Sequence, residues 1–164
     1  MVLGMPLATF TFLHVLISLV GIASGLIVLE RFFRNRTLGV SNVVFLVTTI
    51  LTSVTGFLFP FKTFGSPAHI VGTISLLILA IALFALYAGN LVGPWRWIYI
   101  SAAMVALYLN VFVAVAQSFA KIGRLHALAP TGSEPPFVIT QVIVLVLFIV
   151  LGIVALMRFR PPTA

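Results

Sequence analysis

Apolar side chains fill five long stretches of this chain, and short polar or proline-containing segments separate them. A helix needs roughly 20 consecutive apolar residues to cross the hydrocarbon core of a bilayer, which is about 30 Å thick. Each of the five stretches reaches about that length. The pattern therefore predicts transmembrane helices over about residues 6–29, 41–60, 67–89, 94–120 and 136–157.

The connections between these stretches are short, so each helix is expected to run antiparallel to the one before it. We expect an all-α, polytopic transmembrane bundle that forms a single domain over residues 1–164. Residues 142–151 consist of Val, Ile, Leu and Phe only. Because nothing in this run favours a specific neighbour, we expect a four-helix core with a peripheral C-terminal helix against lipid.

Composition supports a membrane protein. Apolar residues make up 62% of the chain and charged residues 7%, whereas soluble domains average about 45–50% and 25%. The net charge of +7 does not indicate nucleic acid as a partner, because the nine basic residues are scattered between apolar runs and form no stripe. With no cysteine, the chain has no disulfide or thiolate metal site.

The distribution of Lys and Arg predicts the orientation, because cytoplasmic loops carry an excess of both. One side of the bundle has six, Arg31, Arg34, Arg36, Arg96, Arg158 and Arg160, and the other has three, Lys62, Lys121 and Arg124. We expect the N-terminus outside, the C-terminus inside, and Trp95, Trp97 and Tyr99 in an inner aromatic belt. The first run lacks a preceding basic residue and is long, so we interpret it as a retained helix rather than a signal peptide.

Polar and small residues recur on the first four predicted helices, and helix three carries His69, Gly72, Thr73 and Leu76 along one face. Helix two is rich in hydroxyls, which favours a central position, although each hydroxyl can bond its own helix backbone. Helices one and four carry stripes that we expect to face the bundle interior. The first stripe is His14, Ser18, Gly21 and Gly25, and the second is Tyr99, Ala103, Ala106, Asn110, Ala114, Gln117 and Lys121.

All three histidines fall on the outer side in this topology. One interpretation makes His14 and His69 axial ligands of a b-type haem held between helices one and three. From the helical rise, their depths differ by about 7 Å, which opposes a shared iron. Alternatively, His14 pairs with Asn110, and His69 pairs with Gln117 or a loop carbonyl. A third possibility is that His69 or His126 donates a hydrogen bond to an apolar ligand such as a quinone. A zinc or copper site formed by the three histidines lacks a nearby acid in the sequence.

The chain has two acidic residues. We expect Glu30 to pair with Arg31 at the inner end of helix one, and Glu134 to lie near the N-terminus of the fifth helix, where the dipole favours an anion. Neither lies mid-membrane, which counts against an ion-coupled pump. The sequence contains no Gly-rich phosphate loop, nucleophile elbow or paired carboxylate, so it does not indicate an enzyme.

Two segments resemble known proteins. The proline-rich outer loop, residues 126–137, either caps the outer mouth of the bundle or is a stiff spacer. It resembles a loop in a family of uncharacterised small bacterial inner-membrane proteins of this size and helix count. Leu13–His14 and Gly25–Leu26 resemble the first helix of small four-helix haem-binding membrane proteins, such as the bacterial haem-containing protoporphyrinogen oxidase. That likeness covers helix one alone, implies His14 as a haem ligand, and extends to no second ligand or catalytic lysine.

Three functions remain open from the sequence. The first is a bacterial inner-membrane protein that binds haem b through His14 and His69, or a similar redox-active or small apolar ligand such as a quinone, near the outer face. In that case Asn110, Gln117 and His126 are possible neighbouring or alternative contacts. The second is a non-catalytic subunit or assembly factor without a cofactor, which docks onto a membrane-protein partner or another copy of itself. The third is a small-solute transporter, which the absence of buried acids disfavours.

Overall fold

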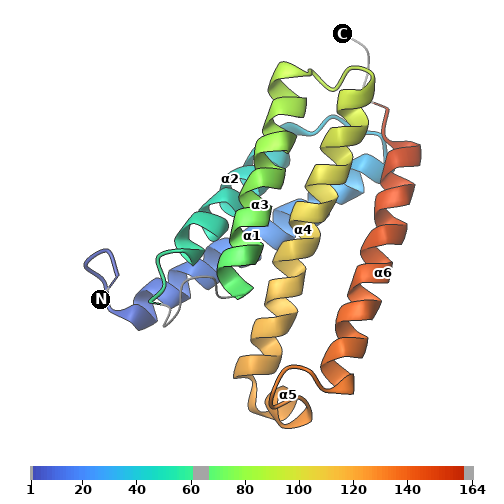
Figure 1. The fold of residues 1–164 in the computed structure, drawn as a ribbon. Coiled ribbons are helices and arrows are strands. Elements are labelled where there is room, and N and C mark those ends of the chain that lie inside the picture. Colours follow the sequence, from blue (N-terminus) through green and yellow to red (C-terminus); the bar gives the residue numbers. More distant parts are fainter. Residues whose placement is uncertain (1, 61–66, 161–164) are drawn as a thin grey trace.

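The computed structural model describes residues 2–60 and 67–160, so Lys62 of the charge count lies outside the described residues. The described residues form α-helices, one π-helical segment and no extended strand (Figure 1). In chain order these are α1 (Leu7–Phe33), α2 (Gly39–Gly56), α3 (Pro67–Leu83), the π-helical segment η1 (Phe84–Ala88), α4 (Pro94–Lys121), α5 (Gly123–Leu128) and α6 (Pro135–Arg158).

Five helical segments in the described residues are long and apolar enough to span a membrane: α1, α2, α3 with η1, α4 and α6. This confirms an all-α, multi-pass membrane protein. The helix limits agree with the sequence prediction except near two ends. α1 continues one turn further, to Phe33, because Phe32 is buried in the core, and α2 ends at Gly56, one turn earlier than expected.

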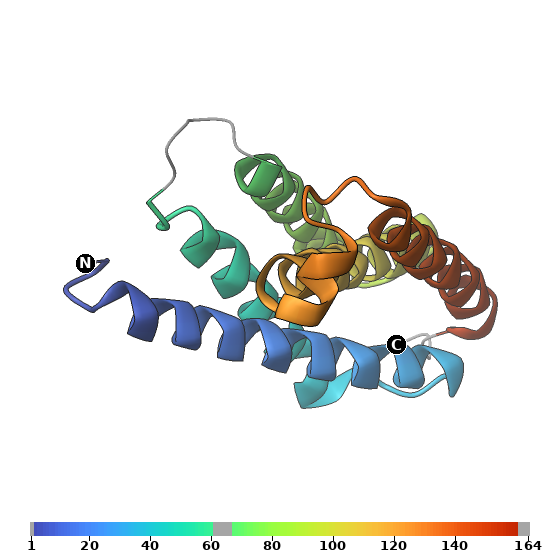
Figure 2. The ribbon, with the colours of Figure 1, turned by 90° about the horizontal axis from the view of Figure 1, so that it is seen from below.

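α2 and α4 form the centre of the bundle. α2 packs against α1, α3 and α4, whereas α4 packs against α1, α2, α3 and α6. Figure 2 shows α2 between α1 and α3. α6 contacts α4 and α1 along one side and leaves most of its side chains exposed, which confirms the prediction of a four-helix core with a peripheral C-terminal helix.

The end of the bundle that carries six arginines is held together by aromatic side chains. Phe32 of α1 lies at ring-centroid distances of 4.9 Å from Phe159 and 6.2 Å from Tyr99. Tyr99 is fully buried and its hydroxyl donates a hydrogen bond to the Asn42 side chain of α2. The expectation of Tyr99 in an aromatic belt was therefore wrong. Its hydroxyl finds a partner inside the bundle, whereas Trp97 is exposed.

The pairing expected for Glu30 was also wrong. Its carboxylate forms an ion pair of 2.6 Å with Arg34, one helical turn further along α1. Arg31 instead donates to the Thr37 carbonyl oxygen at 2.6 Å. Residues four apart lie on the same helical face, whereas adjacent residues point in different directions, so Arg34 is the partner that Glu30 reaches.

The Tyr99–Asn42 hydrogen bond gives a first prediction. Tyr99→Phe leaves the Asn42 side chain, which is 3% exposed, without its donor. We expect the free energy of unfolding to fall by about 1–3 kcal/mol, because a buried polar group without a partner is costly. Unfolding in mixed micelles of a mild detergent and dodecyl sulfate measures the change. Tyr87→Phe, at an exposed tyrosine, is the matched control, and equal stability of the two variants would contradict the prediction.

Candidate functional site

His14 lies early in α1, half-buried against the C-terminal end of α2. Its Nδ1 is 2.7 Å from the Thr55 hydroxyl oxygen. The edge of the Phe59 ring packs against the imidazole at a centroid distance of 5.1 Å, and Phe10 packs against Phe59 in turn at 5.0 Å. The imidazole is therefore fixed by one hydrogen bond and one aromatic contact, both made with the end of α2.

The hydrogen bonds of Thr55 determine which His14 nitrogen carries the proton. The Thr55 hydroxyl lies 2.6 Å from the Leu51 carbonyl oxygen, and only a hydroxyl proton between them makes that distance favourable. The Thr55 oxygen then accepts from His14, so Nδ1 is the protonated nitrogen. In a neutral imidazole with the proton on Nδ1, the lone pair lies on Nε2.

The C-terminal end of α4 supplies a positive charge near this site. Lys121 lies close enough to His14 to contribute to the electrostatic environment of the imidazole. Both Lys121 and Gln117, one turn earlier, are exposed. The site thus combines a fixed imidazole on α1, a hydroxyl on α2 and a cationic group from α4.

His69 lies on the other side of α2. It is half-buried near the start of α3, and its ring packs against Phe57 at a centroid distance of 5.6 Å. His14 packs instead against Thr55 and Phe59, and α2 lies between α1 and α3 (Figure 2). The two imidazoles thus approach the same end of α2 from different sides. A haem shared between them stays a prediction from the sequence.

The other candidate residues, Asn110, Gln117 and His126, lie along the C-terminal half of α4 and in the segment after it. Asn110 of α4 donates to the Thr49 hydroxyl oxygen at 3.1 Å, so the proposed pairing of Asn110 with His14 was wrong. Asn110 bonds Thr49 and not His14 because it lies beside Thr49 and Gly21, at the point where α1, α2 and α4 meet. His126, expected in a loop, lies exposed in the short helix α5.

Sequence reasoning missed the role of single hydroxyls on α2. Besides Thr55 and Thr49, the Ser53 hydroxyl is hydrogen-bonded to the Ser75 hydroxyl of α3 at 2.9 Å. Through these three side chains α2 is hydrogen-bonded to α1, α4 and α3. Several of the α2 hydroxyls also bond their own backbone, as the sequence predicted. The hydroxyl-rich composition indicated a central helix, but it did not indicate which hydroxyl meets His14.

The proline-rich loop before α6 is organised around the Glu134 carboxylate. One carboxylate oxygen accepts from the Thr131 backbone N–H at 3.0 Å and from the Thr131 hydroxyl at 2.9 Å. The other accepts from the Ser133 backbone N–H at 3.1 Å. These hydrogen bonds, with the Thr131 backbone bond foremost, lower the pKa of Glu134 to about 2. Glu134 directly precedes α6, as expected for an anion at a helix N-terminus.

The Glu134 hydrogen bonds give a second prediction, a pH dependence of the loop. Because the pKa is lowered on folding, the loop is stabilised above the usual glutamate pKa near 4.5, and this stabilisation is lost as the pH falls through about 2. We expect the Glu134 carboxyl carbon to titrate near pH 2 in NMR spectra. Thr131→Ala should raise that midpoint part of the way to 4.5, and Thr140→Ala, whose hydroxyl bonds Pro136 instead, should not. A wild-type midpoint near 4.5 would refute this role.

Within residues 2–60 and 67–160, no group of three or more His, Asp or Glu side chains could hold a metal ion. Comparison of the chain with protein-family models, with curated proteins and with solved structures found no match.

Proposed function

We propose that this protein is a multi-pass bacterial inner-membrane protein that binds a redox-active apolar ligand, a b-type haem or the quinol form of a quinone, at Nε2 of His14 near the outer face. The observation that carries the proposal is the hydrogen bond between His14 and Thr55. It holds the proton on Nδ1 and leaves the Nε2 lone pair for a ligand.

This arrangement suits both ligands for the same reason. A histidine that binds a metal through one nitrogen commonly donates from the other to a nearby oxygen, which fixes the tautomer and orients the ring. Haem iron accepts the lone pair of such an imidazole directly. A quinol hydroxyl donates a hydrogen bond to the same lone pair, so the two ligands differ in the bond formed and share the contact atom.

The proposal assigns unequal roles to the histidines. His14 supplies one axial position to haem, or the single acceptor to a quinol. His69, which packs on the other side of α2, is a candidate for a separate contact, as are Asn110, Gln117 and His126. We therefore expect His14→Ala to abolish ligand binding, and His69→Ala to weaken it less.

Visible spectra of the oxidised and dithionite-reduced protein test the proposal. The protein is purified in mild detergent from cells supplied with a haem precursor, and the same preparation is extracted with organic solvent for quinone analysis. A Soret band that shifts on reduction and disappears in His14→Ala supports haem. Co-purified quinone that disappears in the same variant supports the quinone. The absence of both ligands, or their retention in His14→Ala, would refute the proposal.

A second candidate function is a non-catalytic subunit or assembly factor. The observation that favours it is α6, which is the least buried of the membrane-spanning helices described and presents an unbroken apolar face. A colourless, quinone-free protein that co-purifies with a defined membrane partner, or with itself, would support this function.

A further inference from the structure

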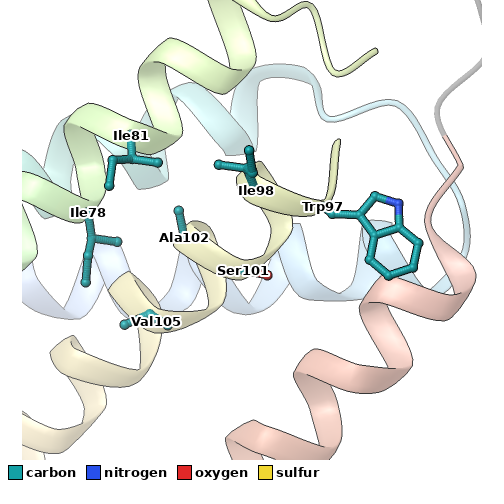
Figure 3. Close-up of a pocket in the computed structure, with 7 residues that line it drawn as sticks. All are labelled: Ile78, Ile81, Trp97, Ile98, Ser101, Ala102 and Val105. Carbon is teal, nitrogen blue, oxygen red and sulfur yellow. The ribbon is translucent and has the colours of Figure 1, made fainter. Parts of the chain in front are cut away.

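Two lipid-facing grooves flank α4 at the end of the bundle that carries six arginines. The first, of about 390 Å³, lies between α3 and α4 (Figure 3). The second, of about 220 Å³, lies between α4 and α6. Both grooves are lined by Ser101 and Val105, so these residues form a ridge on α4 with one groove on each side.

The grooves extend over most of one bilayer leaflet. The first groove runs along α4 from Trp97 to Val105, and the second runs along α6 from Leu145 to Leu156. These eight and eleven residues of α-helix rise about 12 Å and about 16 Å, and half of a 30 Å hydrocarbon core is about 15 Å. Nearly all of the lining is apolar, with Ile78 and Ile81 on the α3 side and Leu145 and Ile149 on the α6 side. Each groove therefore fits one acyl chain of one leaflet.

Positive charge gathers where the two grooves reach the membrane surface. Arg96 precedes Trp97 directly, and its guanidinium donates to the Phe159 carbonyl oxygen and lies 5.1 Å from the Trp97 ring. Phe159 stands between Arg158 and Arg160, both of which are exposed. Glu30, the one acidic residue at this end, is paired with Arg34. Exposed cationic groups at the level of lipid headgroups attract anionic lipids.

We propose that this surface is a binding site for one anionic diacyl phospholipid, whose two chains lie in the grooves on either side of the Ser101–Val105 ridge and whose headgroup is held by Arg96, Arg158 and Arg160. Two grooves around one ridge match the two chains of a single lipid, and the arginines match its charge. The site lies at the end of the bundle away from His14 and does not depend on the proposed function.

Fluorescence quenching at Trp97 tests the site. The chain has two tryptophans, so Trp97 is the only tryptophan that fluoresces in Trp95→Phe. If Trp95→Phe is unstable, the difference between the fluorescence of the wild type and that of Trp97→Phe gives the Trp97 signal instead. The protein is placed in vesicles in which either phosphatidylglycerol or phosphatidylcholine carries brominated chains. We expect phosphatidylglycerol to occupy the site at least about fivefold more strongly, and Arg158→Gln to reduce that preference about fivefold. Arg124→Gln, at the opposite end of the bundle, is the control.

A groove variant separates this site from general lipid contact. Ser101→Phe places a bulky side chain on the ridge and should lower the maximum quenching of Trp97, whereas Val146→Phe, on an exposed part of α6 outside the grooves, should not. Equal quenching by the two lipids would overturn the proposal, as would a preference that survives the combined Arg158→Gln and Arg160→Gln changes.

Discussion

Gly25→Ala is expected to destabilise the bundle by about 1–3 kcal/mol, the usual cost of forcing a methyl group into a filled core. A β-carbon at Gly25 would lie 2.6 Å from Leu107 Cδ1 of α4 and 2.9 Å from the Phe45 ring of α2. Both neighbours are 1% exposed, so neither has free space to move into. The variant should therefore either separate α1 from α2 and α4 or displace a buried side chain.

A second glycine provides the matched control. In Gly152→Ala of α6 the new β-carbon would meet Met104 Cγ at 3.9 Å, an ordinary contact distance. This change should be neutral or stabilise by up to about 1 kcal/mol, because alanine favours helix over glycine. Unfolding by dodecyl sulfate in mixed micelles compares the two variants. If Gly25→Ala is as stable as Gly152→Ala, then α1 does not pack closely against α2 and α4 at Gly25.

Thr55→Val is expected to weaken ligand binding about 10–100-fold, the usual effect of losing the hydrogen-bond partner of a ligating histidine. Valine has nearly the shape of threonine but cannot accept the His14 Nδ1–H, so the proton is free to occupy either nitrogen. Thr55→Ser keeps the hydroxyl and should restore binding. Titration of ligand-free protein with haem, followed by absorbance, measures the change.

A further control tests whether the Thr55 effect is specific. The Thr48 hydroxyl donates to the Val44 carbonyl oxygen of its own helix. Thr48 also faces α1, because a β-carbon at Gly21 would lie 3.2 Å from the Thr48 hydroxyl oxygen. Thr48→Val removes an α2 hydroxyl without changing the partner of His14, so it should leave haem affinity unchanged. Equal losses in Thr48→Val and Thr55→Val would mean that the hydroxyls act on the packing of α2 and not on His14.

Helix number and packing faces could be predicted because they depend on local patterns. Apolar length sets the membrane spans, and the spacing of Gly21 and Gly25 marks the face of α1 that approaches its neighbours. Both glycines are buried, as the stripe predicted. Likewise the charge-free run in α6 indicated a peripheral helix, and α6 packs along one side of the bundle.

Pairwise contacts could not be predicted, because they depend on how the helices cross. The sequence suggested Asn110 as the partner of His14, whereas the packing of α1 against α2 brings Thr55 to the imidazole and leaves Asn110 bonded to Thr49. Tyr99 lies close to Trp97 in sequence, yet the two point in different directions, one to Asn42 and one outward. The short helix α5 has six residues, too few to show a helical period.

Nitrogen NMR of ¹⁵N-histidine-labelled, ligand-free protein in detergent determines whether Nε2 of His14 is unprotonated and therefore able to bind a ligand. The chain has three histidines, so the His14 signals are assigned as those missing from the spectrum of His14→Gln. We predict a protonated, pyrrole-type shift for Nδ1 and an unprotonated, pyridine-type shift for Nε2 at neutral pH. The reverse assignment, or rapid exchange between the two tautomers, would contradict the account.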